Sequence, residues 1–349
     1  LPYSANPATN ANAANVEAVC RILMDQTFAG TADIFYSNPQ FYNAVGPAFA
    51  FPTLVGNPNV QPETAKTWTV GAVIDSPFYD SAIFSGLRLS VDYYNIAVDD
   101  AIGPQTLDTA QRGCFDATFN PAIANDPAAA AASPFCQQIG RVAGDGALGN
   151  VLVTYLNNGR VRTEGIDVQF DWSFPVGPGT FSVNSVFNYL ITLKSAPLPA
   201  EAGPAGELVE YAGTLGPAGS NGIGENGLNP GSFRWKMLNT FSYSAGPATV
   251  SLQWQHLPSA QSISYPFDNE TPFVGSPAYD LFNLSASITA YDNVTFRFGV
   301  DNLLDKDPPL VEYNAASTGL ANSVGGNPIN AFFFDLVGRR YYAGVNMKF

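Results

Sequence analysis

The chain ends in RRYYAGVNMKF, residues 339–349, and this stretch alternates between two kinds of side chain up to its last residue. The more apolar set is Tyr341, Ala343, Val345, Met347 and Phe349, and the interleaved set is Arg340, Tyr342, Gly344, Asn346 and Lys348. Successive side chains of a strand point to opposite faces, so the stretch predicts a strand with one apolar face. Chain ends usually fray, so a strand that runs to a final aromatic residue needs a specific reason.

The same two-residue period returns in segments upstream. These segments lie at 67–75, 87–93, 166–174, 181–192, 233–243, 250–255, 282–289 and 294–301. The segment at 166–174 extends towards the N-terminus through VLVTYLNNGRVRT at 151–163. Ser, Thr, Asn and Gln dominate the opposite faces. With the terminal strand, the pattern predicts an all-β chain of about nine strands.

The connections between these segments alternate between short and long. Short ones at 76–85, 175–179, 244–248 and 291–293 contain the Gly, Pro, Asn and Asp of tight turns. Long ones lie at 103–150, 195–230, 258–277 and 303–338. A soluble β-sandwich would explain the alternation of side chains but not that of the connections. Together they predict an antiparallel transmembrane β-barrel, with periplasmic turns and long extracellular loops that carry short helices.

The C-terminal spacing also fits a sorting signal. Tyr342, Gly344, Met347 and Phe349 follow the order polar, Gly, apolar, aromatic, with the spacing that the barrel-assembly machinery of the outer membrane recognises. The apolar face would then meet outer-membrane lipid, with Tyr341 and Phe349 in the two aromatic girdles. A strand that must close a barrel and carry this signal explains why the alternation continues to the end.

Composition narrows the function classes. Only 13% of residues are charged, against about a quarter in soluble domains. The formal net charge of −14 leaves no basic patch for phosphates, so nucleic acid is not expected as a partner. A single His and the lack of a CxxC motif predict no metal site, and nothing indicates a cofactor.

Catalysis is not expected either. The candidate carboxylates are Asp99, Asp100, Glu201, Glu207 and Glu210. They lack a partner nucleophile or base at a recognisable spacing, so we interpret them as solvated loop charges and predict that the chain is not an enzyme.

Three stretches resemble a known family in order and spacing. They are GNPNVQPETAKTWTVGAV at 56–73, GRVRTEGIDVQFDWSF at 159–174 and FGVDNLLDKDP at 298–308. They resemble the C-terminal part of the barrel of TonB-dependent outer-membrane receptors. The resemblance implies a barrel of about 22 strands, filled by an N-terminal plug whose TonB box contacts the TonB complex. It also implies active import of a scarce ligand, such as a siderophore, saccharide or peptide, across the bacterial outer membrane.

Strand parity predicts that an upstream half of the same barrel completes the structure. Single-chain bacterial barrels have even strand numbers, and an open sheet would leave two unpaired edges in lipid. We therefore expect residues 1–62 to be an extracellular loop segment and 63–349 to be the C-terminal barrel portion. No stretch resembles the plug or the TonB box. A passive porin or adhesin-type barrel, or a secreted carbohydrate-binding β protein, remains the alternative.

The cysteines suit an oxidising compartment. Cys114 and Cys136 share one long loop and predict a disulfide, with Ser133 as N-cap and Pro134 opening a short helix. The sequence favours an upstream partner for Cys20, with a packed thiol on a helical face as the alternative.

Loop aromatics offer the best ligand candidates. Phe35, Tyr36, Phe41 and Tyr42 lie in an aromatic-rich stretch at 28–51. Exposed aromatic rings bind partners or pack against neighbours, so this stretch predicts a ligand platform, with packing between loops as the alternative.

Overall fold

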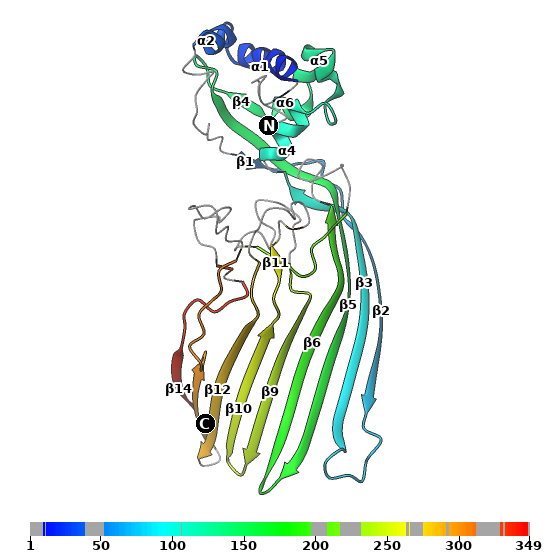
Figure 1. Cartoon of the computed structure of the whole chain (residues 1–349), viewed down its shortest axis with the longest axis vertical. Helices are drawn as coiled ribbons and strands as arrows, with labels where there is room; N and C mark the ends of the chain where they lie inside the picture. Colours follow the sequence, from blue (N-terminus) through cyan, green and yellow to red (C-terminus); the bar gives the residue numbers. More distant parts are fainter. Residues whose placement is uncertain are drawn as a thin grey trace.

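The computed structural model describes residues 10, 12–38, 52–105, 107–196, 208–216, 232–262, 265, 275–290, 293–311, 329–330 and 332–347. Its main feature is one curved sheet with a path of nine strands in the order β14-β13-β12-β10-β9-β6-β5-β3-β2 (Figure 1). The strands are β2 (Thr64–Asp75), β3 (Gly86–Pro104), β5 (Leu148–Val176), β6 (Gly179–Ala196), β9 (Trp235–Ala245), β10 (Ala248–Leu257), β12 (Tyr279–Ala290), β13 (Val294–Asp301) and β14 (Arg340–Met347). The predicted all-β class and strand segments are confirmed.

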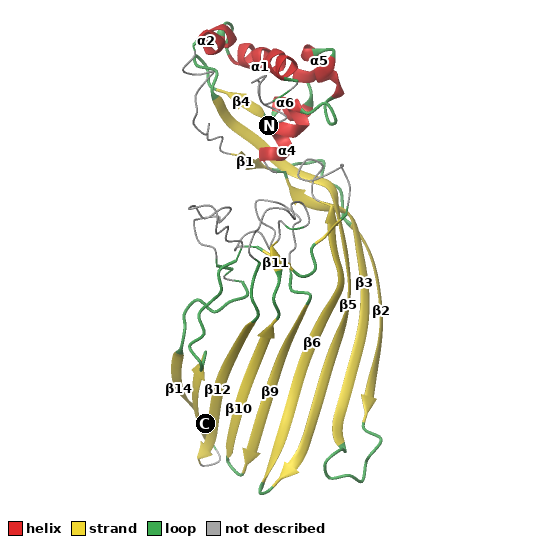
Figure 2. Ribbon diagram, viewed as in Figure 1, coloured by secondary structure: helices red, strands yellow, loops and turns green. Residues whose placement is uncertain are grey.

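The sheet is an open part of a barrel. All neighbours on this path pair antiparallel, and the described turns at the lower end in Figure 2 join β2 to β3, β5 to β6, and β9 to β10. Within the described residues, β2 and β14 each pair on one side only, so the sheet does not close on itself. Among the described helices, none combines the length and apolarity that a membrane crossing requires.

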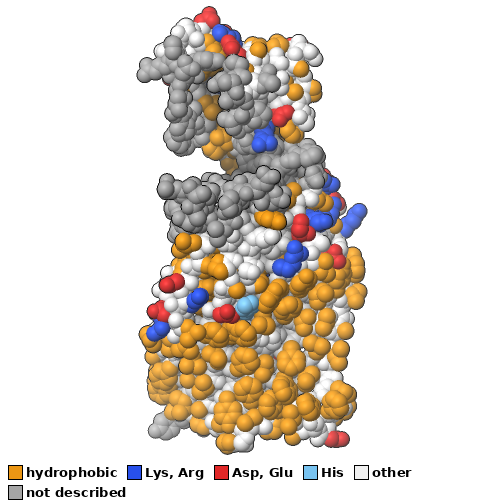
Figure 3. Space-filling view, viewed as in Figure 1, with side chains coloured by type: hydrophobic (Ala, Val, Ile, Leu, Met, Phe, Trp, Pro, Cys, Tyr) orange, Lys and Arg blue, Asp and Glu red, His pale blue; other side chains and the backbone are white. Residues whose placement is uncertain are grey.

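One face of the sheet is a continuous apolar surface. Figure 3 shows this surface over the strands, with charged side chains above it. The register places apolar residues side by side, as in the row Leu252, Leu284 and Val300 and the row Ala286, Phe298 and Ala343. A broad apolar band bordered by aromatic residues is the outer surface of a membrane barrel. The alternation in the sequence therefore gives the lipid-facing side of each strand.

Smaller elements lie beyond the upper end of the sheet. They are α1 (Ala13–Thr27), α2 (Thr31–Ser37), β1 (Pro52–Val55), α4 (Leu107–Phe115), η1 (Pro121–Ala124), α5 (Pro127–Ala131), α6 (Pro134–Gln137) and β4 (Ile139–Arg141). The two-residue strand β7 (Val209–Glu210) pairs with β6, and the two-residue strands β8 (Thr214–Leu215) and β11 (Gln261–Ser262) pair with each other. The first seven residues of β5, 148–154, extend beyond the barrel sheet and pair with β1 and β4, whereas β5 pairs with β3 from Tyr155 onward.

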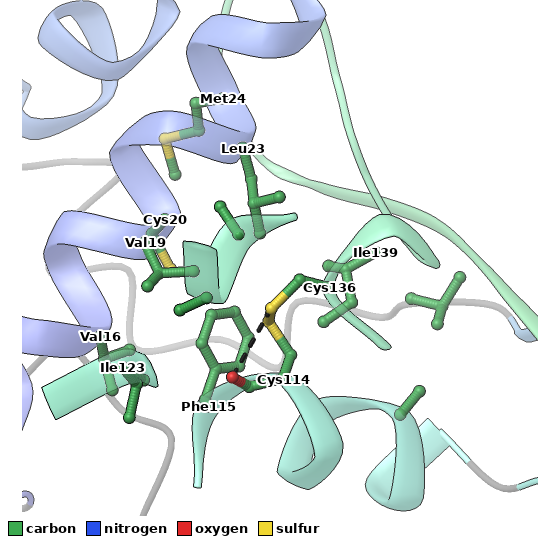
Figure 4. Close-up of a cluster of buried hydrophobic side chains, with 14 of the residues drawn as sticks. Val16, Val19, Cys20, Leu23, Met24, Cys114, Phe115, Ile123, Cys136 and Ile139 are labelled. Carbon is green, nitrogen blue, oxygen red and sulfur yellow. Dashed lines mark hydrogen bonds between the residues drawn. A yellow bond between two sulfur atoms is a disulfide. The ribbon is translucent and has the colours of Figure 1, made fainter. Parts of the chain in front are cut away.

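We call the unit formed by residues 12–38, 52–55 and 107–156 the cap. Its core gathers buried side chains from α1, the four short loop helices and β5 (Figure 4). From α1 come Val16, Val19, Cys20, Leu23 and Met24, whose three- and four-residue spacing places them on one face of the helix. The cap is therefore a small globular unit with a core of its own, held above the membrane by the long β5.

The structure corrects one strand boundary. The alternation places Phe233 on the apolar strand face, but β9 begins at Trp235 and Phe233 is only 1% exposed. Its ring packs edge to face on Phe333 in a second core beneath the upper loops, with centroids 5.2 Å apart. The strand assignment at Phe233 is wrong because loop packing, which the local pattern does not encode, buries this ring.

Asn302 has a structural role in the stretch FGVDNLLDKDP at 298–308. It directly follows the last residue of β13, has a φ of 52° and is 1% exposed. Its Nδ2 donates to Lys306 O (3.0 Å) and Asp335 Oδ2 (3.3 Å), and its Oδ1 accepts from Lys306 N (2.7 Å). Its own N–H donates to Asn283 Oδ1 of β12 (2.8 Å). The Asn302 side chain thus holds the loop together while its backbone N–H ties the loop to the sheet, and Asn tolerates the left-handed backbone.

Asn302→Ala is expected to lower the free energy of unfolding of the barrel by about 1–3 kcal/mol, because buried partners lose their hydrogen bonds. Asn302→Gly is the matched control, since it loses the same side chain but accepts the left-handed backbone. Urea unfolding of the membrane-embedded protein measures both. A midpoint unchanged in Asn302→Ala would contradict this role.

Candidate functional site

The polar positions of β3, β5, β6 and β9 form the face opposite the lipid surface. We call the group Ser90, Asp92, Tyr94, Asp167, Gln169, Asn188 and Lys236 the lumenal wall. It lines a hollow of about 750 Å³. The wall arises directly from the alternation, because each of these strands places every second residue on this face.

Two carboxylates of the lumenal wall lie directly opposite each other. Asp92 on β3 is the cross-strand neighbour of Asp167 on β5. Repulsion between two like charges in this position destabilises the sheet. Asn188 Nδ2 donates to Asp167 Oδ1 (2.6 Å), and Ser90 Oγ donates to Asp92 Oδ2 (2.9 Å). These neutral donors stabilise the carboxylates without cancelling their charge. The wall therefore suits a facing surface that supplies cations or hydrogen-bond donors.

The stretch RTEGIDV at 162–168 contains Gly165, a position where the structure requires a glycine. Gly165 lies opposite Tyr94 at a register shift between β5 and β6. A Cβ at this position would overlap the Tyr94 ring and the Tyr189 carbonyl. The glycine thus lets the Tyr94 ring cover the backbone of β5 on the lumenal wall.

The cap contains a second polar group, around Tyr36. The Arg21 guanidinium lies 4.2 Å from the centre of the Tyr36 ring and also pairs with Glu17 (2.8 Å). Arg141 Nη2 approaches the Cys20 Sγ at 3.3 Å. Burial raises the pKa of the Cys20 thiol, which the Arg141 charge opposes, and burial also raises the pKa of the Tyr36 phenol. Both groups therefore stay protonated at neutral pH.

Cys20 is a free, buried thiol in this structure. Its burial in the cap core fits the packed-thiol alternative. The upstream disulfide partner that the sequence favours would lie outside this chain and stays a prediction. Its neighbours on the α1 face explain the burial, since the helix presents this side to the cap core.

The predicted ligand platform is only partly in view. Phe35 and Tyr36 pack against the cap core from α2, with their rings edge to face at 5.0 Å. Phe41 and Tyr42 lie outside the described residues. Phe28, which the sequence does not single out, is exposed between α1 and α2. An aromatic residue just beyond an apolar helical face is the signal that could have found it.

The predicted assembly signal lies on the edge strand β14. Tyr342 faces Gly299 of β13, where a Cβ would overlap its ring, and Gly344 faces Arg297. Met347 pairs with Val294 on the apolar face, and Phe349 lies outside the described residues. Tyr342 thus has a packing role on the lumenal side, and the signal itself stays a prediction.

Metal binding has no candidate in the described part of the chain, where no three His, Cys, Asp or Glu residues are placed to hold an ion. The loop carboxylates considered for catalysis do not form one group in the described part of the chain. Asp99 pairs with Arg162, Glu210 accepts backbone N–H groups of Leu193 and Ala212, and Glu201 and Glu207 lie outside the described residues.

The family model for the TonB dependent receptor-like, beta-barrel matches residues 24–303. No curated protein matches the chain. A mutant of the ferric enterobactin receptor PfeA from Pseudomonas aeruginosa is 13% identical with a TM-score of 0.48, over 85% of this chain and 32% of that one. The outer membrane transporter YddB from Escherichia coli is 10% identical with a TM-score of 0.49, over 91% and 36%.

A third similar structure is the FrpB iron transporter from Neisseria meningitidis, which is 11% identical with a TM-score of 0.45, over 85% of this chain and 33% of that one. The chain spans about a third of the length of these proteins. The family match covers most of the chain, and the open sheet has the apolar outer face that such a barrel requires. The chain belongs to the TonB-dependent receptor-like β-barrel family of the bacterial outer membrane.

Proposed function

We propose that the chain is the C-terminal barrel portion of a receptor that imports a scarce ligand across the outer membrane at the expense of TonB-transmitted energy. The ligand class is a siderophore, a saccharide, a peptide or a similar molecule. The family match over residues 24–303 carries this proposal. The sheet supplies the wall of the pathway, and the chain acts in transport and not as an enzyme.

The lumenal wall supports a partner inside the barrel. Asp92 and Asp167 present adjacent carboxylates that only neutral side chains stabilise within the described hydrogen bonds. A plug segment with basic or donor groups would neutralise them, and through that plug the receptor would contact the TonB complex. This partner belongs to the upstream part of the receptor.

The open edges support a second partner. The outer sides of β2 and β14 carry unpaired backbone groups in the described sheet, and each such group costs several kcal/mol in hydrocarbon. We propose that upstream strands of the same barrel pair with both edges, after delivery by the barrel-assembly machinery. Residues 1–62 then form an extracellular segment, and 63–349 the C-terminal part of the barrel.

We also propose that the extracellular aromatics Phe35, Tyr36, Phe41 and Tyr42 contribute to ligand capture. The position of α2 in the cap, far from the tight turns, supports this role (Figure 1). Tyr36 would act by holding the cap surface together, because its ring is already packed by Arg21.

Uptake by cells that carry the full-length receptor tests the proposal. We expect accumulation of a radiolabelled ferric siderophore or oligosaccharide from a panel to fall to background when TonB is deleted. Phe41→Ala with Tyr42→Ala should weaken capture of the same compound while the barrel still assembles. Uptake that persists without TonB would instead show a passive porin. If no compound of the panel is taken up while the receptor is assembled, import of these ligand classes is contradicted.

A further inference from the structure

The turn between β2 and β3, residues 76–85, differs from the other tight turns at the lower end of the sheet. Gly177 and Pro178 alone join β5 to β6, and Gly246 and Pro247 alone join β9 to β10. The β2–β3 turn is visibly larger in Figure 1 and has the sequence SPFYDSAIFS. It contains four large apolar side chains and a single charged residue, Asp80.

Hydrogen bonds give this turn a defined shape. Ser81 Oγ accepts from the backbone N–H groups of Ile83 (3.3 Å) and Phe84 (3.1 Å), and Ser81 O accepts from Ser85 N (3.0 Å). At the start of the turn, Ser76 Oγ accepts from Phe78 N (3.2 Å). The chain thus holds its apolar side chains in fixed positions.

These side chains are nevertheless open to the surroundings. Tyr79 is 80% and Phe78 61% exposed, and about half of Ile83 and of Phe84 is exposed. Large apolar groups in contact with water lose the free energy that burial would supply, about 25 cal/mol per Å². A cluster of this kind on an ordered turn indicates a surface that covers it.

The cluster is continuous with the lipid-facing surface of the barrel. The Phe84 ring stacks on Trp172 of β5, with centroids 6.3 Å apart and planes within 2°. Trp172 Nε1 donates to the Ile83 carbonyl at 2.7 Å. Trp172 also packs against Phe174, which in turn packs against Phe181 of β6 on the same face. The turn therefore extends an aromatic row that already borders the membrane.

We propose that the β2–β3 turn is a membrane anchor that lies in the headgroup–acyl boundary of the periplasmic leaflet. Its occupant is lipid, because Phe84 and Trp172 join the turn to the lipid face and not to the lumenal wall. Phe and Tyr side chains suit this boundary, where a ring meets acyl chains and a hydroxyl meets water. The one charged residue of the turn, Asp80, can be accommodated on the polar headgroup side of this boundary.

A nitroxide spin label at Tyr79→Cys in the full-length receptor, reconstituted in phospholipid vesicles, tests the anchor. We expect the label to be several-fold more accessible to oxygen than to a water-soluble nickel chelate. Pro178→Cys, in the tight β5–β6 turn, is the matched control and should favour the nickel chelate. The unlabelled wild type controls for Cys20, which is buried.

Trp172→Phe provides a second readout. It keeps an aromatic ring beneath Phe84 but removes the hydrogen bond to the Ile83 carbonyl. The label at position 79 should then shift towards water while the barrel stays folded. A label at 79 as accessible to the nickel chelate as that at 178 would show a turn in the periplasm and overturn the proposal. A label accessible to neither reagent would show a covering protein and also overturn it.

Discussion

Phe298→Arg is expected to destabilise the folded barrel by about 2–4 kcal/mol, the penalty for Arg near the midplane of the lipid face. Phe298 lies in the middle of β13, is 49% exposed and has Ala286 and Ala343 as neighbours across the sheet. These small neighbours offer no partner for a guanidinium. The charge must therefore stay in hydrocarbon or distort the sheet to reach water.

Arg297→Phe is the control, because it changes the adjacent residue of the same strand in the opposite sense. Arg297 faces Ser287 and Gly344 on the lumenal side, where water solvates a charge and tolerates a ring. We expect the folded, heat-modifiable band on unboiled gels to disappear for Phe298→Arg and to persist for Arg297→Phe. Equal behaviour of the two variants would mean that the faces are assigned wrongly.

The strands could be predicted from the sequence because their signal is local. Each residue shows by its neighbours two positions away which face it takes, and lipid on one side with water on the other makes the contrast strong. The segment at 294–301 thus coincides with β13, and the segment at 282–289 lies within β12, which begins three residues earlier and ends one residue later. The N-cap of helix α6 could also be predicted from the local sequence, and in the structure Ser133 Oγ accepts a hydrogen bond from Cys136 N.

The cap could not be predicted as a unit, because long-range contacts create it. Helix α1 packs on α5 and η1, about a hundred positions away in sequence, and β1 pairs in parallel with β5. The sequence of α1 or of β1 does not indicate which distant segment it will contact. The apolar face of α1 indicated only that something would cover it.

The ligand platform shows the same limit. The sequence marks Phe35 and Tyr36 as aromatic, but whether a ring binds or packs depends on what lies beside it. In the structure, Arg21 of α1 covers the Tyr36 ring and the core covers one side of Phe35. The aromatic composition thus identified the stretch at 28–51, but only the fold shows which of the described rings pack against other side chains.

Loss of the Cys114–Cys136 disulfide is expected to destabilise the cap by about 3 kcal/mol in the chain-entropy model, given a sequence separation of 22. The predicted bond is present, with both residues fully buried. The closed loop contains η1 and α5, on which α1 packs. Opening the loop therefore removes support from a helix outside it.

Asn120 makes this loop a single unit. Its Nδ2 lies within hydrogen-bond distance of Cys114 O (2.8 Å) and Ala130 O (3.1 Å), at the centre of the closed loop. The same Nδ2 lies 3.7 Å from Cys136 Sγ, so Asn120 contacts both ends of the closed loop. Without the cross-link, the unfolded loop gains conformational freedom that the hydrogen bonds alone must oppose.

Hydrogen exchange of the α1 amides in the full-length receptor measures the effect. The double variant Cys114→Ala, Cys136→Ala should lose about a hundredfold in protection, the equivalent of roughly 3 kcal/mol. Cys20→Ala is the control, because it removes a buried sulfur from the same core without opening a loop, and its loss should be clearly smaller. Amides of β9 and β10 should not change in either variant. If α1 in the double variant exchanged no faster than in Cys20→Ala, core packing and not the cross-link would be what stabilises the cap.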